Sequence, residues 1–213
     1  SGIGAAATAL FASEGAIVFA ADIDVDGGEK LAADTPGDVR FAQCDVCDPA
    51  AIKALMNRAG DETGGIDVVF NNAGTSVLGT PIGDLSFADW RKVMSVNVDG
   101  AFLVARAAFI QMRGQDPQGG RIINNGSISA HVPRPGSVAY TASKHAITGL
   151  TRSISLDGRA CNIACGQIDI GNAASDMTAK MPQGVPQPDG SVRAEPVMDA
   201  AHVASSVLHM AGL

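Results

Sequence analysis

Short apolar runs alternate along the chain with longer stretches in which apolar residues recur every three or four positions. The short runs are typical of buried strands and the longer stretches are typical of helices. The apolar runs cover residues 16–21, 39–43, 66–70, 121–125 and 162–167. The helical stretches cover residues 3–13, 49–63, 87–112, 138–157 and 199–210. The stretch at residues 49–63 begins with Pro49, a residue favoured at the first helical position, and Asp48 before it is expected to be the N-cap.

Strands that are apolar on both faces and are separated by helices indicate repeated βαβ units. The pattern therefore predicts an α/β protein with a doubly wound parallel sheet that helices cover on both sides. No linker or internal repeat interrupts the pattern, so we expect residues 1–213 to form a single domain. Residues 181–196 are rich in Pro, Gly and Gln, which is typical of either a solvated surface excursion or a substrate loop.

Composition narrows the range of partners. The 213 residues include 15 Lys and Arg against 22 Asp and Glu, giving a net charge of -7, and no basic run stands out. This balance argues against binding to nucleic acid or to an anionic membrane surface. The longest apolar stretches, such as residues 16–21, are too short to span a bilayer, and no signal peptide is visible. We therefore expect a cytoplasmic protein.

Four cysteines raise the question of a metal site. Cys44 and Cys47 form a C-x-x-C pair, and Cys161 and Cys165 lie close together later in the chain. This spacing is compatible with zinc or redox chemistry. Reduced thiols that act as small apolar residues are the simpler interpretation, and we expect no metal.

The start of the chain has the features of a dinucleotide site. Ser1-Gly2-Ile3-Gly4 runs directly into an Ala-rich helical stretch, whose N-terminal N–H groups could bind a pyrophosphate. The next strand ends at Asp22, where a carboxylate can accept hydrogen bonds from both ribose hydroxyls of an adenosine. That carboxylate, with Asp24 and Asp26 nearby, would repel a 2′-phosphate. The sequence therefore favours NAD over NADP.

Two later segments carry candidate chemistry. Asn71-Asn72-Ala73-Gly74 follows the strand at residues 66–70, where small residues would permit close contact with a cofactor; a plain turn is the alternative. Tyr140 and Lys144 are four residues apart on one helix face, and Tyr140 is the only tyrosine. A cation near the phenol would lower its pKa from roughly 10 and make it usable for proton transfer.

A serine upstream of this pair could hold a substrate oxygen beside the phenol. Ser127 lies just after the strand at residues 121–125, and Ser129 is a competing candidate.

Taken in order, these motifs resemble the short-chain dehydrogenase/reductase family over essentially the whole chain. Ser1 to Gly4 match the second half of the family's glycine-rich turn, and Asp22 matches its acidic NAD selector. The aspartate on the adenine side falls on Asp45, followed by Val46, and the N-N-A-G motif is unaltered at Asn71 to Gly74. The family's helix asparagine falls on Asn97, its serine on Ser127 and its Y-x-x-x-K pair on Tyr140 and Lys144.

The resemblance implies a Rossmann-type domain that binds NAD and interconverts an alcohol and a carbonyl compound, with a catalytic tetrad. Tyr140 would donate or accept the proton, and Lys144 would lower the pKa of the tyrosine and bind the nicotinamide ribose. Ser127 would position the substrate oxygen. Asn97 would hold a water that links Lys144 to solvent, at a local interruption of helical bonding. The family usually forms homodimers or homotetramers through the helices at residues 87–112 and 138–157.

The sequence departs from the family pattern after its sixth strand. Cys165-Gly166 replaces the usual Pro-Gly. Ile168 occupies the position whose backbone meets the nicotinamide carboxamide, and Ile170 replaces a threonine that contacts the cofactor. One side-chain contact to the cofactor is therefore in doubt, and the substrate cannot be inferred.

The family's strand order, 3-2-1-4-5-6-7, has further consequences. The family's first strand precedes Ser1 and its final strand follows residues 199–210, and this sequence shows neither. Without the first strand, the facing edges of strands two and four would hold unpaired polar groups, each costing roughly 1–3 kcal/mol against a stability of about 5–15. We expect that these residues alone do not form an active enzyme. The same order places the two cysteine pairs too far apart to share one metal.

Two alternatives to a dehydrogenase remain. A sugar-nucleotide epimerase or dehydratase shares the fold and the Tyr/Lys pair, but it needs a larger C-terminal substrate region than residues 181–197 provide. A cofactor-sensing module without catalysis would not need the intact Asn97, Ser127, Tyr140 and Lys144.

Overall fold

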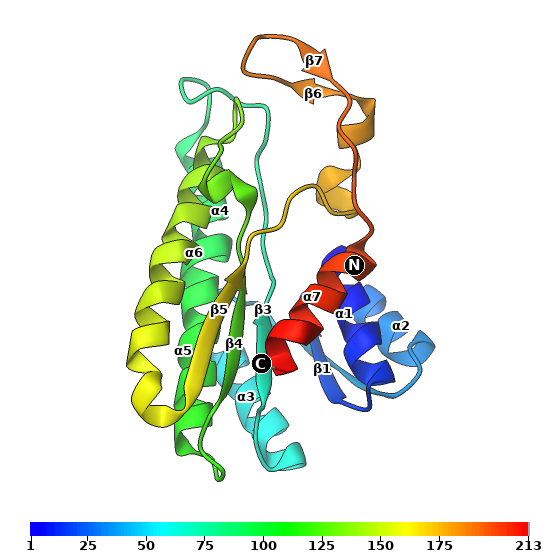
Figure 1. The fold of residues 1–213 in the computed structure, drawn as a ribbon, viewed down its shortest axis with the longest axis vertical. Helices are drawn as coiled ribbons and strands as arrows, with labels where there is room; N and C mark the ends of the chain where they lie inside the picture. The colour runs from blue at the N-terminus through cyan, green and yellow to red at the C-terminus, as the bar shows by residue number, and fades with distance from the viewer. Residues whose placement is uncertain (213) are drawn as a thin grey trace.

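The computed structural model describes residues 1–212 and has the α/β architecture that the sequence predicts (Figure 1). The α-helices are α1 (Gly2–Ser13), α2 (Val25–Asp34), α3 (Pro49–Thr63), α4 (Phe87–Met94), α5 (Ala101–Gly114), α6 (Val138–Asp157) and α7 (Ala200–Gly212). The strands are β1 (Ile17–Asp22), β2 (Asp38–Gln43), β3 (Val68–Asn71), β4 (Gly120–Asn125), β5 (Ile163–Ile168), β6 (Val185–Pro186) and β7 (Val192–Arg193). Single turns of helix are η1 (Ser95–Gly100), η2 (Ile128–Ala130), η3 (Arg159–Cys161), η4 (Asp176–Thr178) and η5 (Met181–Gln183).

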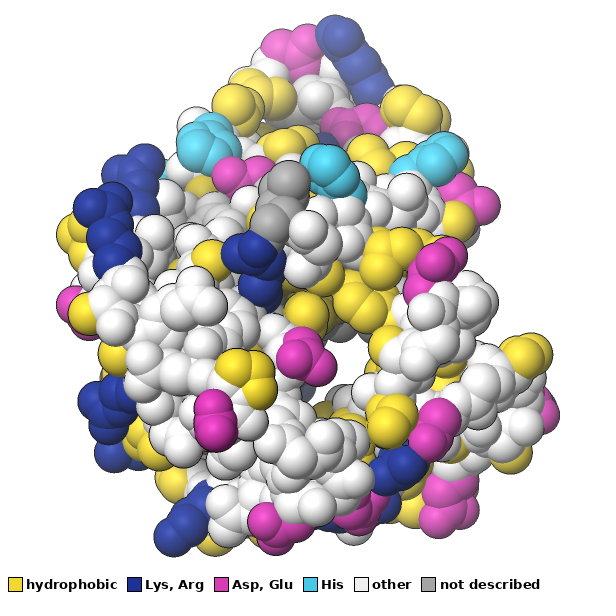
Figure 2. Space-filling model, turned by 60° about the horizontal axis from the view of Figure 1, so that its bottom comes forward, with side chains coloured by type: hydrophobic (Ala, Val, Ile, Leu, Met, Phe, Trp, Pro, Cys, Tyr) yellow, Lys and Arg dark blue, Asp and Glu magenta, His cyan; other side chains and the backbone are white. Residues whose placement is uncertain are grey.

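The parallel sheet is divided into two parts. β1 pairs with β2, and β3, β4 and β5 pair in that order, all in parallel. Within residues 1–212, no strand pairs with the edge of β1 that faces away from β2, or with the edge of β3 that faces away from β4. These are the two edges between which the family's first strand is expected. In the space-filling view, a hollow bordered in part by hydrophobic side chains lies between the two parts (Figure 2).

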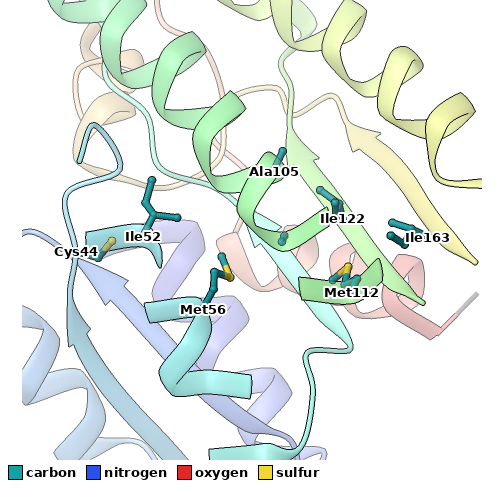
Figure 3. Packing of buried hydrophobic residues seen from close by; sticks show 8 residues of the cluster. Cys44, Ile52, Met56, Ala105, Met112, Ile122 and Ile163 are labelled. Carbon is teal, nitrogen blue, oxygen red and sulfur yellow. The ribbon is translucent and has the colours of Figure 1, made fainter. Parts of the chain in front are cut away.

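Two hydrophobic clusters lie on opposite faces of β4, because the consecutive residues Ile122 and Ile123 point to opposite sides of the strand. The first cluster packs α3 and α5 against the sheet, as Figure 3 shows. Its buried members are Cys44, Ile52, Met56, Ala105, Ala108, Met112, Ile122 and Ile163. The second cluster packs α1 and α7 against the other face, with Ile123, Ile170, Ala173, Val203 and Val207 buried. Coverage of both faces confirms the predicted doubly wound class.

Local signals explain where several elements begin. The Asp48 carboxylate accepts a hydrogen bond from the N–H of Ala50 at 2.8 Å, and Pro49 is the first residue of α3, as predicted. The short helix α2 was not predicted, because Gly27 and Gly28 disfavour helices. Asp24 caps α2 by accepting from the N–H of Gly27 at 3.1 Å. Gly28 lies so close to the ring of Phe41 that any larger side chain would collide with it.

The long helical stretch predicted at residues 87–112 is divided into three. The π-helical turn η1 (Ser95–Gly100) separates α4 from α5, so the regular hydrogen bonding breaks around Asn97. By length and composition alone, the continuous stretch Phe87–Gly114 could cross a membrane. In this fold its buried residues, among them Val93, Ala105 and Met112, instead pack within the domain.

The excursion at residues 181–196 is not an irregular loop. It contains η5 and a small antiparallel hairpin of β6 and β7, in which Val185 lies opposite Arg193. Figure 1 shows this hairpin beyond the carboxyl ends of β4 and β5, at the top of the molecule. The segment therefore lies at the end of the sheet that carries the candidate site residues.

Candidate active site

The N-terminus of α1 forms one end of the site. Ser1 is the N-cap of α1 and makes no side-chain capping bond, so the first N–H groups of the helix keep their capacity to bind a ligand. Gly2 has a φ of +52°, and a Cβ on Gly4 would lie 3.1 Å from Nδ2 of Asn72. The glycines thus let this turn approach the segment after β3, and Ile3 packs against the second hydrophobic cluster. These features fit a dinucleotide whose pyrophosphate lies at the start of α1.

Two aspartates follow the adjacent strands β1 and β2. Asp22 is the exposed last residue of β1, and its Oδ1 accepts the N–H of Asp24 at 3.1 Å. This bond orients the carboxylate and leaves its other oxygen available to hydroxyl groups. Asp45 follows β2 and accepts the N–H of Cys47 at 2.8 Å. Val46 packs against Gly100 at the end of the π-helical turn, which brings the adenine side of the site next to α5.

The segment from Asn71 to Gly74 is braced by buried amides. Nδ2 of Asn71 donates to the carbonyl of Ala101 at 2.8 Å and to Oδ1 of Asn124 at 3.1 Å. Asn72 accepts from Asn125 at 2.7 Å, so the ends of β3 and β4 are joined by side chains as well as by the ladder. A Cβ on Gly74 would lie 3.5 Å from Oδ1 of Asn97. With Ala73 between them, these small residues leave the backbone accessible to a cofactor.

Asn97 is buried in the π-helical turn and joins three parts of the site. Its Oδ1 accepts the N–H of Thr75 at 2.8 Å, and its Nδ2 donates to the carbonyl of Thr75 at 2.9 Å. Nδ2 also donates to Oγ of Ser143 at 3.0 Å, and Ser143 precedes Lys144 in α6. In this arrangement Asn97 fixes the chain after β3 relative to α6, and a role in a proton relay stays a prediction.

Ser127, Tyr140 and Lys144 lie together at the carboxyl ends of β4 and β5. Tyr140 is in the first turn of α6, and its hydroxyl lies close enough to the side chain of Ser127 for that side chain to lower its pKa. Lys144 is only 5% exposed, and its Nζ donates to the carbonyl of Asn125 at 2.7 Å. The same Nζ lies 5.5 Å from the centroid of the Tyr140 ring. Ser129 instead uses its N–H to bond Oγ of Ser127 at 3.1 Å, so Ser127 is the serine paired with the phenol.

Burial controls the protonation of this pair. Burial raises the pKa of Tyr140, because a buried phenolate loses hydration, and the neighbouring side chain of Ser127 lowers that pKa in part. In the protein alone the net effect is therefore a raised pKa of Tyr140, and the expectation that Lys144 lowers this pKa stays a prediction. Burial also lowers the pKa of Lys144 to about 8, against the opposing effect of the Asp169 charge.

Asp169 and His131 belong to the site but were missed from the sequence. Oδ1 of Asp169 accepts the N–H of Ser127 at 3.1 Å and Nε2 of Gln167 at 2.5 Å, while Oδ2 lies 3.0 Å from Nε2 of His131. The hydrogen bonds from His131, Gln167 and Ser127 outweigh burial and hold the pKa of Asp169 below its usual value. The position of Asp169 in the sequence could have identified it, because it is a carboxylate directly after a parallel strand, at the edge of the sheet where ligands usually bind.

Backbone hydrogen bonds join the end of β5 and the chain after it to the segment that follows β4. The carbonyl of Ile168 accepts the N–H of Gly126 at 2.9 Å, and the carbonyl of Ile170 accepts that of Ile128 at 3.2 Å. The side chain of Ile170 is buried in the second hydrophobic cluster. It therefore serves packing at the position where the family has a threonine.

All four cysteines are free thiols. Cys44 is buried in the first hydrophobic cluster, and Cys161 and Cys165 pack against it. Burial raises the pKa of Cys165 to about 12, so this thiol is unreactive near neutral pH. Across residues 1–212, no three His, Cys, Asp or Glu side chains are grouped closely enough to hold a metal ion.

Comparisons with known proteins agree with this geometry. A family model for short chain dehydrogenases matches residues 1–185. The chain is 36% identical over 160 residues to D-threitol dehydrogenase of Mycolicibacterium smegmatis, covering 74% of this chain and 60% of that protein. It is 34% identical over 196 residues to 3-alpha-(or 20-beta)-hydroxysteroid dehydrogenase of Mycobacterium tuberculosis, covering 92% and 74%. It is 32% identical over 186 residues to meso-2,3-butanediol dehydrogenase of Serratia marcescens, covering 87% and 72%.

A solved structure shows the same fold. The crystal structure of 3-ketoacyl-(acyl-carrier-protein) reductase from Brucella melitensis, complexed with NADH, matches with a TM-score of 0.87 over 99% of this chain and 86% of that one, at 21% identity. The chain spans 60 to 62% of the length of several of its relatives, D-threitol dehydrogenase among them. From its matching family model, its relatives and its fold, the chain belongs to the short-chain dehydrogenase family.

Proposed function

We propose that the protein containing these residues is an NAD-dependent oxidoreductase that interconverts a secondary alcohol and a ketone. The observation that carries the proposal is the convergence of Ser127, Tyr140 and Lys144 beside the glycine turn of α1 and the segment Asn71 to Gly74. The similar proteins described above are named as dehydrogenases or reductases, which favours this function over an epimerase, a dehydratase or a cofactor sensor.

The side chains divide the proton chemistry between them. In the direction of reduction, the Tyr140 hydroxyl donates its proton to the substrate oxygen, which Ser127 holds by a hydrogen bond. The buried phenolate that results is stabilised by the ammonium of Lys144, which lies near the same ring. In oxidation the proton moves the other way. When bound, the reduced nicotinamide would donate the hydride in reduction of the ketone, and the oxidised nicotinamide would accept it in oxidation of the alcohol.

Asp22 supports NAD rather than NADP as the cofactor. Its carboxylate stands at the end of β1, and Asp24 and Asp26 add negative charge beside it. An adenosine ribose with two free hydroxyls would gain hydrogen bonds there, whereas a 2′-phosphate would be repelled.

The substrate is a small alcohol or carbonyl compound, and the protein is a cytoplasmic homodimer or homotetramer. Exposed apolar side chains on the outer helices support association: Phe102 and Ile110 on α5 and Leu156 on α6. Light scattering of the intact protein after gel filtration tests the oligomeric state. A monomer at micromolar concentration would contradict it.

The experiment for the activity follows nicotinamide absorbance in the intact protein with a panel of diols, hydroxysteroids and ketones. Tyr140→Phe should lower turnover by about 100-fold or more, the usual contribution of a general acid or base, while NADH still binds. Ser127→Ala should also lower turnover strongly, and its neighbour Ser129→Ala serves as the matched control with little loss. Unchanged turnover in Tyr140→Phe would refute the assigned proton donor.

A further inference from the structure

A cluster of four polar side chains joins segments that are far apart in the sequence. Arg134, Asn172, Gln187 and Glu195 form this cluster, which we call the clasp. Nη1 of Arg134 donates to Oε1 of Glu195 at 2.7 Å, and Nη2 donates to Oε2 at 2.5 Å. Gln187 donates to Oε1 at 2.8 Å and Asn172 donates to Oε2 at 2.8 Å. Each carboxylate oxygen of Glu195 thus accepts two hydrogen bonds.

One side of the clasp is anchored to the helix that carries Tyr140. Arg134 donates its backbone N–H to Oγ of Ser137 at 3.2 Å, and Ser137 donates back to the carbonyl of Arg134 at 2.7 Å. Ser137 is the N-cap of α6, and its Oγ lies 2.9 Å from Oγ1 of Thr141. The backbone of Arg134 is therefore fixed relative to the first turn of α6, where Tyr140 lies.

The other side of the clasp belongs to the excursion at residues 181–196. Gln187 directly follows β6 inside the hairpin, and Glu195 lies just after β7, where its N–H donates to the carbonyl of Met181 at 3.0 Å. Asn172, from the chain after β5, donates to the carbonyl of Pro196 at 3.3 Å. The clasp therefore connects the whole excursion to the start of α6 and to the end of β5.

A second ion pair in the same hairpin shows what distinguishes the clasp. Arg193 and Asp189 are 2.6 Å apart, but their side chains are 66% and 55% exposed and lie four residues apart, so this pair is local and solvated. The side chains of Arg134 and Glu195 are only 25% and 21% exposed and are 61 residues apart. A bidentate, partly buried pair is geometrically specific, and the loss of one partner leaves the other without its hydrogen bonds.

We propose that Arg134 and Glu195 are positioning residues that hold residues 181–196 against the start of α6 and thereby set the affinity for the substrate. The hydrogen bonds to Glu195 hold its pKa at about 2, so the clasp stays charged throughout the working pH range. The clasp touches neither Tyr140 nor the segments that would hold NAD. Its loss should therefore weaken substrate binding and leave the chemical step and cofactor binding nearly unchanged. This inference rests on the proposed function.

The kinetic test uses the intact protein and compares Glu195→Gln with Asp189→Asn, which removes the exposed pair of the same hairpin. Glu195→Gln should raise KM for the substrate about tenfold, with kcat and the Kd of NADH changed less than about twofold, since charged hydrogen-bonded pairs contribute strongly to positioning. Asp189→Asn should leave all three unchanged. Equal KM values in the two variants would overturn the proposal.

A second measurement does not depend on activity. Hydrogen exchange of the backbone amides should become faster within residues 181–196 in Glu195→Gln and stay unchanged in Asp189→Asn. If the unaltered protein shows no turnover with any compound of the panel, the proposed function fails. Hydrogen exchange would still test whether the clasp holds residues 181–196 in place. If Arg134→Glu or Glu195→Gln unfolds the domain, the swapped double variant R134E/E195R restores the pair and should recover slow exchange. Protection of residues 181–196 that is independent of both side chains would disprove the clasp.

Discussion

The backbone N–H of Ser127 donates a hydrogen bond to the carboxylate of Asp169, with 3.1 Å between the nitrogen and Oδ1. The negative charge of Asp169 also raises the pKa of Lys144, opposing the larger effect of burial. One carboxylate thus positions the serine and stabilises the ammonium. His131, 3.0 Å from Oδ2, and Gln167 hold this carboxylate in place.

This relationship predicts the pH profile of Asp169→Asn. The amide oxygen can still accept from Ser127, but the charge that favours the ammonium of Lys144 is lost. The pKa of Lys144, about 8 in the unaltered protein, should fall further. The alkaline loss of activity, which follows deprotonation of Lys144, should therefore begin at lower pH. A pH profile of kcat measures the shift, and His131→Gln, which keeps the charge of Asp169, is the control. An alkaline limb that stays in place would contradict the link between Asp169 and Lys144.

The buried ammonium of Lys144 should lower the free energy of unfolding at neutral pH. Burial lowers its pKa from 10.5 to about 8, so the folded state disfavours the charged form. Below pH 8 both folded and unfolded chains carry the proton and the penalty is constant. Between pH 8 and 10.5 the unfolded chain binds more protons, so stability should rise with pH. Lys144→Met should remove this rise, abolish activity and stabilise the protein at pH 7 by up to about 3 kcal/mol. Urea unfolding at several pH values measures the effect, and a less stable Lys144→Met protein would contradict it.

Asp22 should determine the choice of cofactor. Asp22→Ser removes the acceptor for the ribose hydroxyls and the repulsion of a 2′-phosphate. The ratio of kcat/KM for NAD to that for NADP should fall by about tenfold or more, which is roughly 1.4 kcal/mol. Asp26→Ser, an exposed acidic residue in the same region, is the matched control and should change the ratio much less. An unaffected ratio in Asp22→Ser would refute this role.

Asn97 should be important for stability as well as for the site. Its buried side chain makes three hydrogen bonds, to the N–H and carbonyl of Thr75 and to Ser143. Asn97→Leu would leave these groups without partners, and each unsatisfied buried group costs roughly 1–3 kcal/mol. The free energy of unfolding should fall by at least about 2 kcal/mol, measured by denaturant titration. Asn97→Ser, which retains a donor and an acceptor, should lose less.

Much of the fold could be predicted because hydrophobic period and turn chemistry agree along the chain. The alternation of apolar runs and helical stretches gave the parallel α/β class, and Asp48 with Pro49 located the start of α3. The helix α2 could not be predicted, because Gly28 is required by its close contact with the ring of Phe41 and is not favoured by local helix propensity. Tertiary contact overrides propensity at such positions.

In the site, motif spacing identified the residues but not their protonation. Tyr140 and Lys144 could be placed together because residues four apart share a helix face, and the family resemblance added Ser127 to them. The pKa of Tyr140 could not be predicted, since it depends on how deeply the side chain is buried. The pairing of Arg134 with Glu195 could not be predicted either. The two residues are 61 positions apart in the sequence, and only the fold brings their charges together.

The divided sheet has a consequence for how a dinucleotide would act on this chain. The groups that fit its pyrophosphate and adenosine lie with β1, whereas Tyr140 and Lys144 lie with β3, β4 and β5. No backbone ladder connects these two groups of strands within residues 1–212. A bound dinucleotide would therefore contact both groups of strands at once, with its pyrophosphate and adenosine beside β1 and its nicotinamide beside Tyr140 and Lys144.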